Sequence, residues 1–235
     1  MDAYIVTGAG KGIGRGISKL LISQNYYVIK VDRELFEDPE TTNSDENYLI
    51  NLNEIDSIKE LFNYCEEKAF CLKGIIHCAG LCPVQCVSDI QYKDMETVYG
   101  VNTFSFIELC RCFFQYKRRC PDARILAISS ITSDRPYKNQ LLYSSSKAAL
   151  NQISYSMAQE GIERDVKVNI LQLGAVETDM FRSLNPNMQT IYRHYPLGLM
   201  TIDEVSEIVC DLITEKYKKM TGSIIRMDSG FFVSH

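Results

Sequence analysis

Short apolar runs rich in β-branched residues alternate along this chain with longer segments whose apolar residues recur every three or four positions. The short runs predict strands at Tyr4–Thr7, Tyr27–Val31, Tyr48–Ile50, Gly74–Cys78, Arg124–Ser129, Val166–Leu171 and Ser223–Arg226. The longer segments predict helices at Ile13–Ser23, Ile55–Ala69, Tyr92–Arg118, Leu142–Gly161 and Ile202–Glu215. Because such alternation builds βαβ units, the pattern predicts an α/β fold, a doubly wound parallel sheet with helices on both faces.

Two segments interrupt the alternation. Asp38–Asn47 is polar and contains Pro39, so it predicts a surface loop between the second and third strands rather than a domain linker. Phe181–Leu199 is irregular and contains Pro186 and Pro196, which indicates a substrate cover over residues 180–200. A length of 235 residues fits one large α/β domain, so we expect residues 1–235 to form a single domain.

Acidic residues slightly outnumber basic ones. Lys and Arg total 25 and Asp and Glu total 30, and the net charge of −5 offers no broad attraction to nucleic acid or to an anionic membrane surface. The N-terminus lacks the basic leader of a secretion signal, and no stretch approaches the ~18 uninterrupted apolar residues of a spanning helix. We therefore expect a soluble cytoplasmic protein whose nine cysteines are reduced thiols, most of them small core residues.

A glycine-rich turn joins the first predicted strand to the first predicted helix. Its residues are Thr7, Gly8, Ala9, Gly10, Lys11, Gly12, Ile13 and Gly14. Glycines in this position let the backbone approach a pyrophosphate, and the helix N-terminus offers unpaired N–H groups. Because Lys11 is followed by Gly12 rather than by Ser or Thr, the sequence disfavours a nucleoside-triphosphate loop. It predicts a dinucleotide site.

The second predicted strand is followed by Asp32, 18 residues beyond Gly14. This is close to the ~20 residues expected for the acid that binds a ribose 2′-hydroxyl, so Asp32 favours NAD(H). Lys11 and Arg33 could offset the repulsion between Asp32 and a 2′-phosphate, which leaves NADP(H) open.

Tyr143 and Lys147 lie four residues apart in a predicted helix, so the phenol and the ammonium share one helix face. A free phenol has a pKa of about 10, and a neighbouring cation is expected to lower it toward neutrality, where proton exchange is efficient. Ser130 ends a predicted strand and could donate a hydrogen bond to a substrate carbonyl. Together the three predict an acid–base site.

In this order, the glycine turn, Asp32, Ser130, Tyr143 and Lys147 resemble the short-chain dehydrogenase/reductase family over the whole chain. The resemblance implies a Rossmann-like fold and hydride exchange between a nicotinamide cofactor and a small secondary alcohol or ketone. Further cofactor contacts that it implies are Asn51, Leu52, Cys78, Ala79, Gly80, Gly174, Val176 and Thr178. The segment from Thr221 through Gly230 resembles the family's closing strand.

The resemblance also implies a role for each catalytic residue. Tyr143 would exchange the proton of the substrate oxygen, and Ser130 would orient the carbonyl. Lys147 would lower the pKa of Tyr143 and hold the nicotinamide ribose. Asn102 would complete the tetrad by holding a water in a proton relay, and Val176 and Thr178 would fix the carboxamide.

Three positions depart from the family pattern. His77 and Cys78 stand where two asparagines usually precede Ala79 and Gly80, so the hydrogen bonds of those asparagines are in question. Leu173 replaces the proline before Gly174 and removes a constraint on φ. Asn51 stands where an aspartate usually receives the adenine amino group, and its amide oxygen can still accept that bond.

The substrate is less well defined than the cofactor. Expected pocket residues are Ser130, Thr132, Arg135, Tyr143 and Met180, with Gln85, Phe181, Arg182, Tyr192 and His194 as further candidates. Their cationic and aromatic groups slightly favour a polar or anionic substrate. An NADPH-dependent 3-oxoacyl thioester reductase matches the same motifs, and a nucleotide-sensing protein without turnover is a rival from another class. The family also implies a homotetramer or homodimer built on the fourth and fifth helices and the Phe231-Phe232-Val233 tail.

Other features have simpler explanations. Cys78, Cys82 and Cys86 are spaced by four residues without a Cys-x-x-Cys pair or histidine partners, so we predict no metal site. We interpret His77 as a packing residue at a strand end. The basic run from Lys117 to Arg119 is interpreted as a complement to a helix C-terminus.

Overall fold

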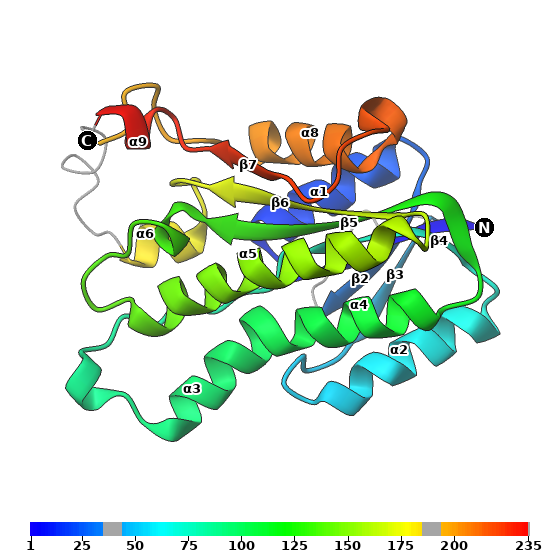
Figure 1. The fold of residues 1–235 in the computed structure, drawn as a ribbon, viewed down its shortest axis with the longest axis horizontal. Coiled ribbons are helices and arrows are strands. Elements are labelled where there is room, and N and C mark those ends of the chain that lie inside the picture. The colour runs from blue at the N-terminus through cyan, green and yellow to red at the C-terminus, as the bar shows by residue number, and fades with distance from the viewer. Residues whose placement is uncertain (35–43, 185–193, 235) are drawn as a thin grey trace.

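The computed structural model describes residues 1–34, 44–184 and 194–234 (Figure 1). Seven strands pair in parallel in the order β3-β2-β1-β4-β5-β6-β7. They are β1 Asp2–Thr7, β2 Tyr27–Asp32, β3 Asp45–Leu49, β4 Cys71–His77, β5 Arg119–Ser130, β6 Val166–Leu173 and β7 Ile224–Met227. The predicted doubly wound sheet is therefore confirmed, because the strand order reverses direction after β1.

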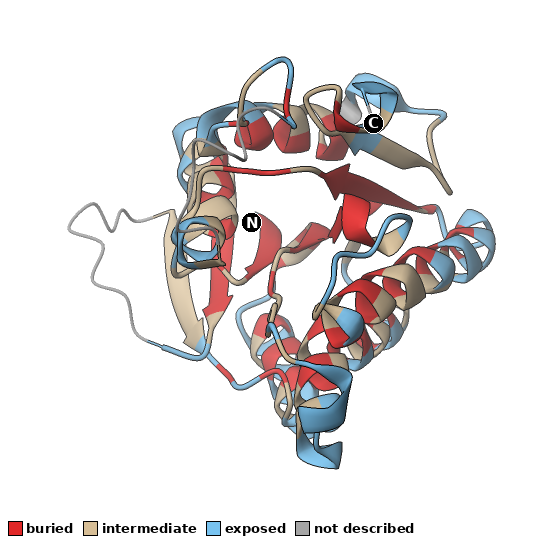
Figure 2. Ribbon diagram, turned by 90° about the vertical axis from the view of Figure 1, so that its left-hand side faces the viewer, coloured by how far each residue is buried: buried red, intermediate tan, exposed pale blue. Residues whose placement is uncertain are grey.

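Helices cover both faces of the sheet. On one face α1 (Gly12–Ser23) packs beside α8 (Ile202–Ile213), and on the other lie α2 (Ile55–Glu67), α4 (Ser105–Gln115) and α5 (Leu141–Ile162) (Figure 1). Each face has its own apolar core, and Figure 2 shows the buried residues concentrated on the sheet and on the inner sides of the helices. No helix in the described part of the chain is long and apolar enough to cross a membrane.

Shorter elements lie between these. They are the turns η1 (Val87–Asp89), η3 (Ile131–Ser133) and η4 (Glu215–Tyr217) and the helices α3 (Tyr92–Tyr99), α6 (Asp179–Leu184) and α9 (Phe231–Ser234).

The third strand begins earlier than predicted. Residues 45–47, expected in the polar loop, belong to β3 and pair with β2 from Val28 to Lys30. Polar residues are tolerated here because β3 is an edge strand whose side chains are only partly covered, and because Asp45 forms a buried ion pair with Lys30. Residues 35–43 of the predicted loop lie outside the described residues.

The predicted single helix from Tyr92 to Arg118 is wrong in two respects. The chain forms α3, a π-helical segment η2 (Gly100–Phe104) and then α4, which ends at Gln115. Arg119 begins β5 and donates to the carbonyls of Phe113, Phe114 and Tyr116 at 2.6–3.1 Å. The expected cation at the helix C-terminus is thus confirmed, but a strand residue supplies it.

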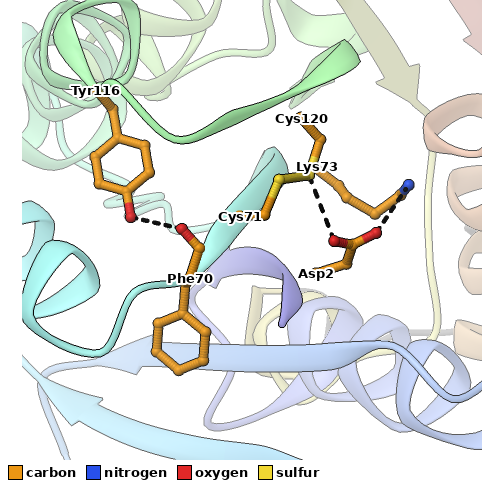
Figure 3. Close-up of a disulfide and its surroundings, with 6 residues drawn as sticks. All are labelled: Asp2, Phe70, Cys71, Lys73, Tyr116 and Cys120. Atoms are coloured by element: carbon orange, nitrogen blue, oxygen red, sulfur yellow. Dashed lines mark hydrogen bonds and ion pairs between the residues drawn. A yellow bond between two sulfur atoms is a disulfide. The ribbon is translucent and has the colours of Figure 1, made fainter.

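The cysteines also differ from expectation. Cys71 and Cys120 form a disulfide that joins the start of β4 to the start of β5, with Asp2 and Lys73 beside it (Figure 3). Reduced thiols were expected throughout, but pairing of β4 with β5 brings the two Cα atoms to 5.6 Å across 49 residues of sequence. Among the described residues, Asp2, Cys71 and Cys120 have potential ligand atoms close enough together to hold a metal ion, but the two sulfurs are already joined in the disulfide. Cys78, Cys82 and Cys86 do not form such a group in the described part of the chain.

Candidate active site

Several predicted site residues lie at or just after the carboxyl ends of four adjacent strands, β1, β4, β5 and β6. Thr7 ends β1 and pairs with His77 at the end of β4. Ser130 ends β5 and pairs with Leu173 at the end of β6. Because parallel strands present their carboxyl ends at one edge, the loops that follow them meet beside the point where strand order reverses.

The glycine turn has a backbone that other residues would not adopt. Gly8 and Gly12 have φ of 68° and 55°, and a Cβ on Gly14 would lie 2.3 Å from the Gly8 carbonyl oxygen. Helix α1 begins at Gly12, and no side chain caps its N-terminus at Lys11. The first amides of α1 can therefore donate to an anion, which fits the pyrophosphate of a dinucleotide.

Asp32 lies against this turn. One carboxylate oxygen accepts the Gly10 N–H at 2.8 Å and the other accepts the Arg33 N–H at 2.8 Å. Arg33 points outward and pairs with Glu34. The acid is thus held beside the glycine turn.

Asn51 and Leu52 form the turn after β3. The Asn51 amide oxygen accepts the Asn53 N–H at 3.2 Å, so it is already engaged in a local turn, while Leu52 is buried in the core. Both side chains are therefore engaged within the protein, one in a local turn and one in the core.

The loop after β4 is hydrogen-bonded to the glycine turn. Thr7 Oγ1 lies 2.9 Å from His77 Nδ1 and accepts the Ala79 N–H at 3.2 Å. Burial, reinforced by Lys147, lowers the pKa of His77 to about 3, so the imidazole is neutral. The centre of its ring lies 5.4 Å from that of Phe106, which confirms the expected packing role. The hydrogen bond with Thr7 is a second role, which was not expected.

Asn102 lies in the π-helical segment and is fully buried. Its Oδ1 accepts the Leu81 N–H at 2.7 Å, and its Nδ2 donates to the Leu81 carbonyl and to Ser146 Oγ at 3.0 and 2.9 Å. The side chain therefore joins the loop after β4 to α5. A π-helical turn often marks a functional position, and here it places this amide between the two elements.

Tyr143 and Lys147 lie in α5, and Lys147 is 3% exposed. Its Nζ donates to the Ile128 carbonyl at 2.8 Å and lies 5.9 Å from the centre of the Tyr143 ring. Burial lowers the pKa of Lys147 to about 8.

The pKa of Tyr143 is raised, contrary to the expectation. Burial is the main cause and nearby Cys82 adds to it, while a hydrogen bond with Ser130 acts in the opposite direction. The Lys147 ammonium lies over the Tyr143 ring and donates to the Ile128 carbonyl. Its attraction for a phenolate therefore does not outweigh the effect of desolvation on the pKa of Tyr143. The phenol is therefore protonated, which suits a proton donor.

The segment after β6 completes the site. Val176 bridges to Met200, the Thr178 N–H donates to the Val176 carbonyl at 2.7 Å, and Thr178 is the nearest neighbour that a Cβ on Gly12 would meet. Thr178 thus lies beside the glycine turn.

Comparison with known proteins identifies the family. The family profile described as short chain dehydrogenase matches residues 2–189. The chain belongs to the short-chain dehydrogenase family. A 3-oxoacyl-[acyl-carrier-protein] reductase of Buchnera aphidicola is 26% identical over 97% of this chain and 96% of its own length. Carbonyl reductase family member 4 of Xenopus tropicalis is 27% identical over 96% and 95%.

Solved structures agree with this fold. A short-chain dehydrogenase family protein from Francisella tularensis superposes with a TM-score of 0.89 at 25% identity, covering 99% of both chains. A 4-hydroxyisoleucine dehydrogenase complexed with NADH has the same TM-score at 22% identity, with 99% coverage of both chains. The fold of the short-chain dehydrogenases is therefore that of this chain.

The departures from the family pattern have local explanations. His77 bonds Thr7, so an imidazole supplies a hydrogen bond at the position of the first asparagine. Leu173 is 3% exposed and packs in the core, and the Gly174 N–H donates to the Met227 carbonyl. A Cβ on Gly174 would lie 2.9 Å from Asp228 Cα, so this glycine is required by close packing of the closing strand.

The expected substrate residues have different surroundings. Thr132 is 4% exposed and bonds Ser130 rather than facing solvent. Arg135 lies over the rings of Phe231 and Phe232, 6.0 and 5.0 Å from their centres. Met180 is exposed on α6.

Sequence reasoning missed the aromatic group around Arg135. Phe231 contacts Tyr137 and Tyr195 and is buried with Ile131, the residue after Ser130. The paired phenylalanines of the tail were a signal, but we interpreted them as a subunit contact. Tyr192 and the middle of the predicted cover, residues 185–193, lie outside the described residues.

Proposed function

We propose that this chain is an NAD(H)-dependent oxidoreductase that interconverts a secondary alcohol and a ketone. The observation that carries the proposal is the placement of Ser130, Tyr143 and Lys147 at the strand edge where the glycine turn opens. Ser130 lies close enough to Tyr143 to act on the pKa of the phenol, and Lys147 lies one helical turn further along α5. A nicotinamide cofactor fits this edge because α1 has no side-chain cap and Asp32 lies at the turn.

In this proposal each end of the cofactor has its own residues. The amides of residues 12–14 bind the pyrophosphate, and Asp32 accepts from the adenosine ribose. Lys147 holds the second ribose, and Val176 and Thr178 hold the carboxamide. When bound, the nicotinamide supplies or accepts the hydride.

The chain itself supplies the proton. During reduction the protonated Tyr143 donates to the ketone oxygen, and Ser130 donates a second hydrogen bond that holds the carbonyl in place. The raised pKa of Tyr143 supports this direction, because a neutral phenol is ready to donate. During oxidation the same groups act in reverse.

The choice of cofactor rests on Asp32. Its carboxylate would repel a 2′-phosphate, so NAD(H) is favoured, while exposed Lys11 and Arg33 are the groups that could admit NADP(H).

A second candidate is NADPH-dependent reduction of a 3-oxoacyl thioester. It is favoured by the curated relatives that bear this name and align over nearly the whole chain. A 3-oxoacyl thioester assayed beside simple ketones and hydroxy acids, each with NADH and with NADPH, separates the two candidates by the ratio of kcat/KM values.

The test of turnover is Tyr143→Phe, which removes the proton donor and leaves the ring. NADH consumption is expected to fall at least a hundredfold, whereas the dissociation constant for NADH stays within about twofold, because the proton moves only in the chemical step. A variant with near-normal turnover contradicts the proposal. NADH binding without turnover of any substrate by the parent protein would favour the nucleotide-sensing alternative.

We also propose that the protein is a homotetramer or homodimer. Exposed apolar residues on η2 and α5, namely Phe104, Tyr155 and Ile162, support contact between copies along these helices. Light scattering coupled to size-exclusion chromatography tests this, and a monomer at micromolar concentration contradicts it.

A further inference from the structure

The hydroxyl of Ser130 has a defined set of neighbours. Ser130 ends β5, and Thr132 follows in the turn η3. The Thr132 N–H donates to Ser130 Oγ at 3.2 Å, and the Thr132 hydroxyl donates to the same oxygen at 3.0 Å. Both residues are buried, with exposed fractions of 8% for Ser130 and 4% for Thr132.

A serine hydroxyl has one proton to donate and two lone pairs that accept. Thr132 occupies both lone pairs, one through its backbone N–H and one through its side chain. The third neighbour of Ser130 is the Tyr143 hydroxyl. Ser130 can therefore only donate, and its single proton goes either to Tyr143 or to a carbonyl bound beside it.

We propose that Thr132 is a positioning residue that makes Ser130 an obligate hydrogen-bond donor. The inference rests on the proposed function, in which Ser130 and Tyr143 both donate to the substrate oxygen. Without the Thr132 hydroxyl, one lone pair of Ser130 is open, and Ser130 can accept from Tyr143 instead of donating. Hydrogen bonds that Ser130 accepts also polarise its own O–H, so Thr132 strengthens the donor as well as directing it.

The turn that carries this pair is fixed from the opposite side. Ser133 Oγ donates to the Ser130 carbonyl at 2.7 Å and accepts from Gln172 Nε2 at 2.8 Å and from Asn151 Nδ2 at 3.0 Å. Gln172 is fully buried and Asn151 is 7% exposed. This support holds Thr132 in place from β6 and α5, so removal of its hydroxyl should change a hydrogen bond and leave the turn intact.

The experiment compares Thr132→Val with Thr132→Ser. Valine keeps the size and the backbone N–H but lacks the hydroxyl, and serine restores the hydroxyl. For ketone reduction, kcat of Thr132→Val is expected to fall about tenfold, the size of one neutral hydrogen bond at the transition state, while Thr132→Ser stays within about threefold of the parent. KM for NADH and the melting temperature serve as controls and should change little. Thr132→Ala replaces the valine variant if that variant does not fold.

A double-mutant cycle decides whether Thr132 acts through Ser130. Adding Thr132→Val to Ser130→Ala should cause no further loss, because the group that Thr132 directs is gone. A further tenfold loss in that background, or a rise in KM for the ketone with kcat unchanged, overturns the proposal and makes Thr132 a direct substrate contact. If Tyr143→Phe and Ser130→Ala both keep full turnover, the proposed function has failed instead.

Discussion

Lys147 should give this protein a marked dependence on pH. The Lys147 residue is 3% exposed, and burial lowers its pKa from 10.5 to about 8. Between pH 7 and pH 9 the protonated fraction should therefore fall from about nine-tenths to about one-tenth. The ammonium is the group that would hold the cofactor ribose beside Tyr143, so kcat/KM for ketone reduction should fall about tenfold over this interval.

Stability should change in the opposite sense. Above pH 8 the folded chain releases the Lys147 proton, whereas the unfolded chain keeps it up to about pH 10.5. The unfolded state then binds more protons, so the free energy of unfolding rises with pH. The difference in pKa corresponds to about 3 kcal/mol of destabilisation at neutral pH, of which about 1 kcal/mol should be recovered by pH 9.

Urea unfolding at pH 7 and pH 9 measures this gain. Lys147→Met is the matched control, because it keeps every other titrating group and lacks the amine. The parent should gain about 1 kcal/mol relative to this variant between the two pH values. Equal pH dependence of the two proteins, together with a flat kcat/KM from pH 7 to pH 9, would refute the assignment of a depressed pKa to Lys147.

Two further changes test other parts of the structure. Asp32→Ala removes the carboxylate beside the glycine turn, so the ratio of kcat/KM with NADPH to that with NADH should rise at least tenfold, and an unchanged ratio places the ribose contact elsewhere. Cys120→Ser opens the link across 49 residues and should lower the free energy of unfolding by about 4 kcal/mol. A reductant should lower the parent to the same value in urea titrations, and no response to reductant would show that the two thiols are not joined in solution.

Local patterns in the chain were sufficient to predict most elements and the placement of Tyr143 and Lys147 on one helix. The glycine turn follows a β-branched run and precedes a helical period, so its position between β1 and α1 could be read directly. Tyr143 and Lys147 share a face because of helical periodicity alone. Ser130 and Thr7 end apolar runs, and parallel strands bring such ends to one edge.

The tertiary structure decided three features that local sequence could not: the disulfide, the start of β3 and the pKa of Tyr143. Each depends on residues that are distant in the sequence. Pairing of β4 with β5 placed Cys71 beside Cys120, and edge-strand pairing recruited polar residues into β3. Desolvation of Tyr143 exceeds the effect of the cation one turn away, because charge in a buried site depends on the whole surrounding volume and on where the ammonium points. The chain sequence by itself thus determined which groups are present and in what order, whereas packing determined their protonation and the direction in which each donates.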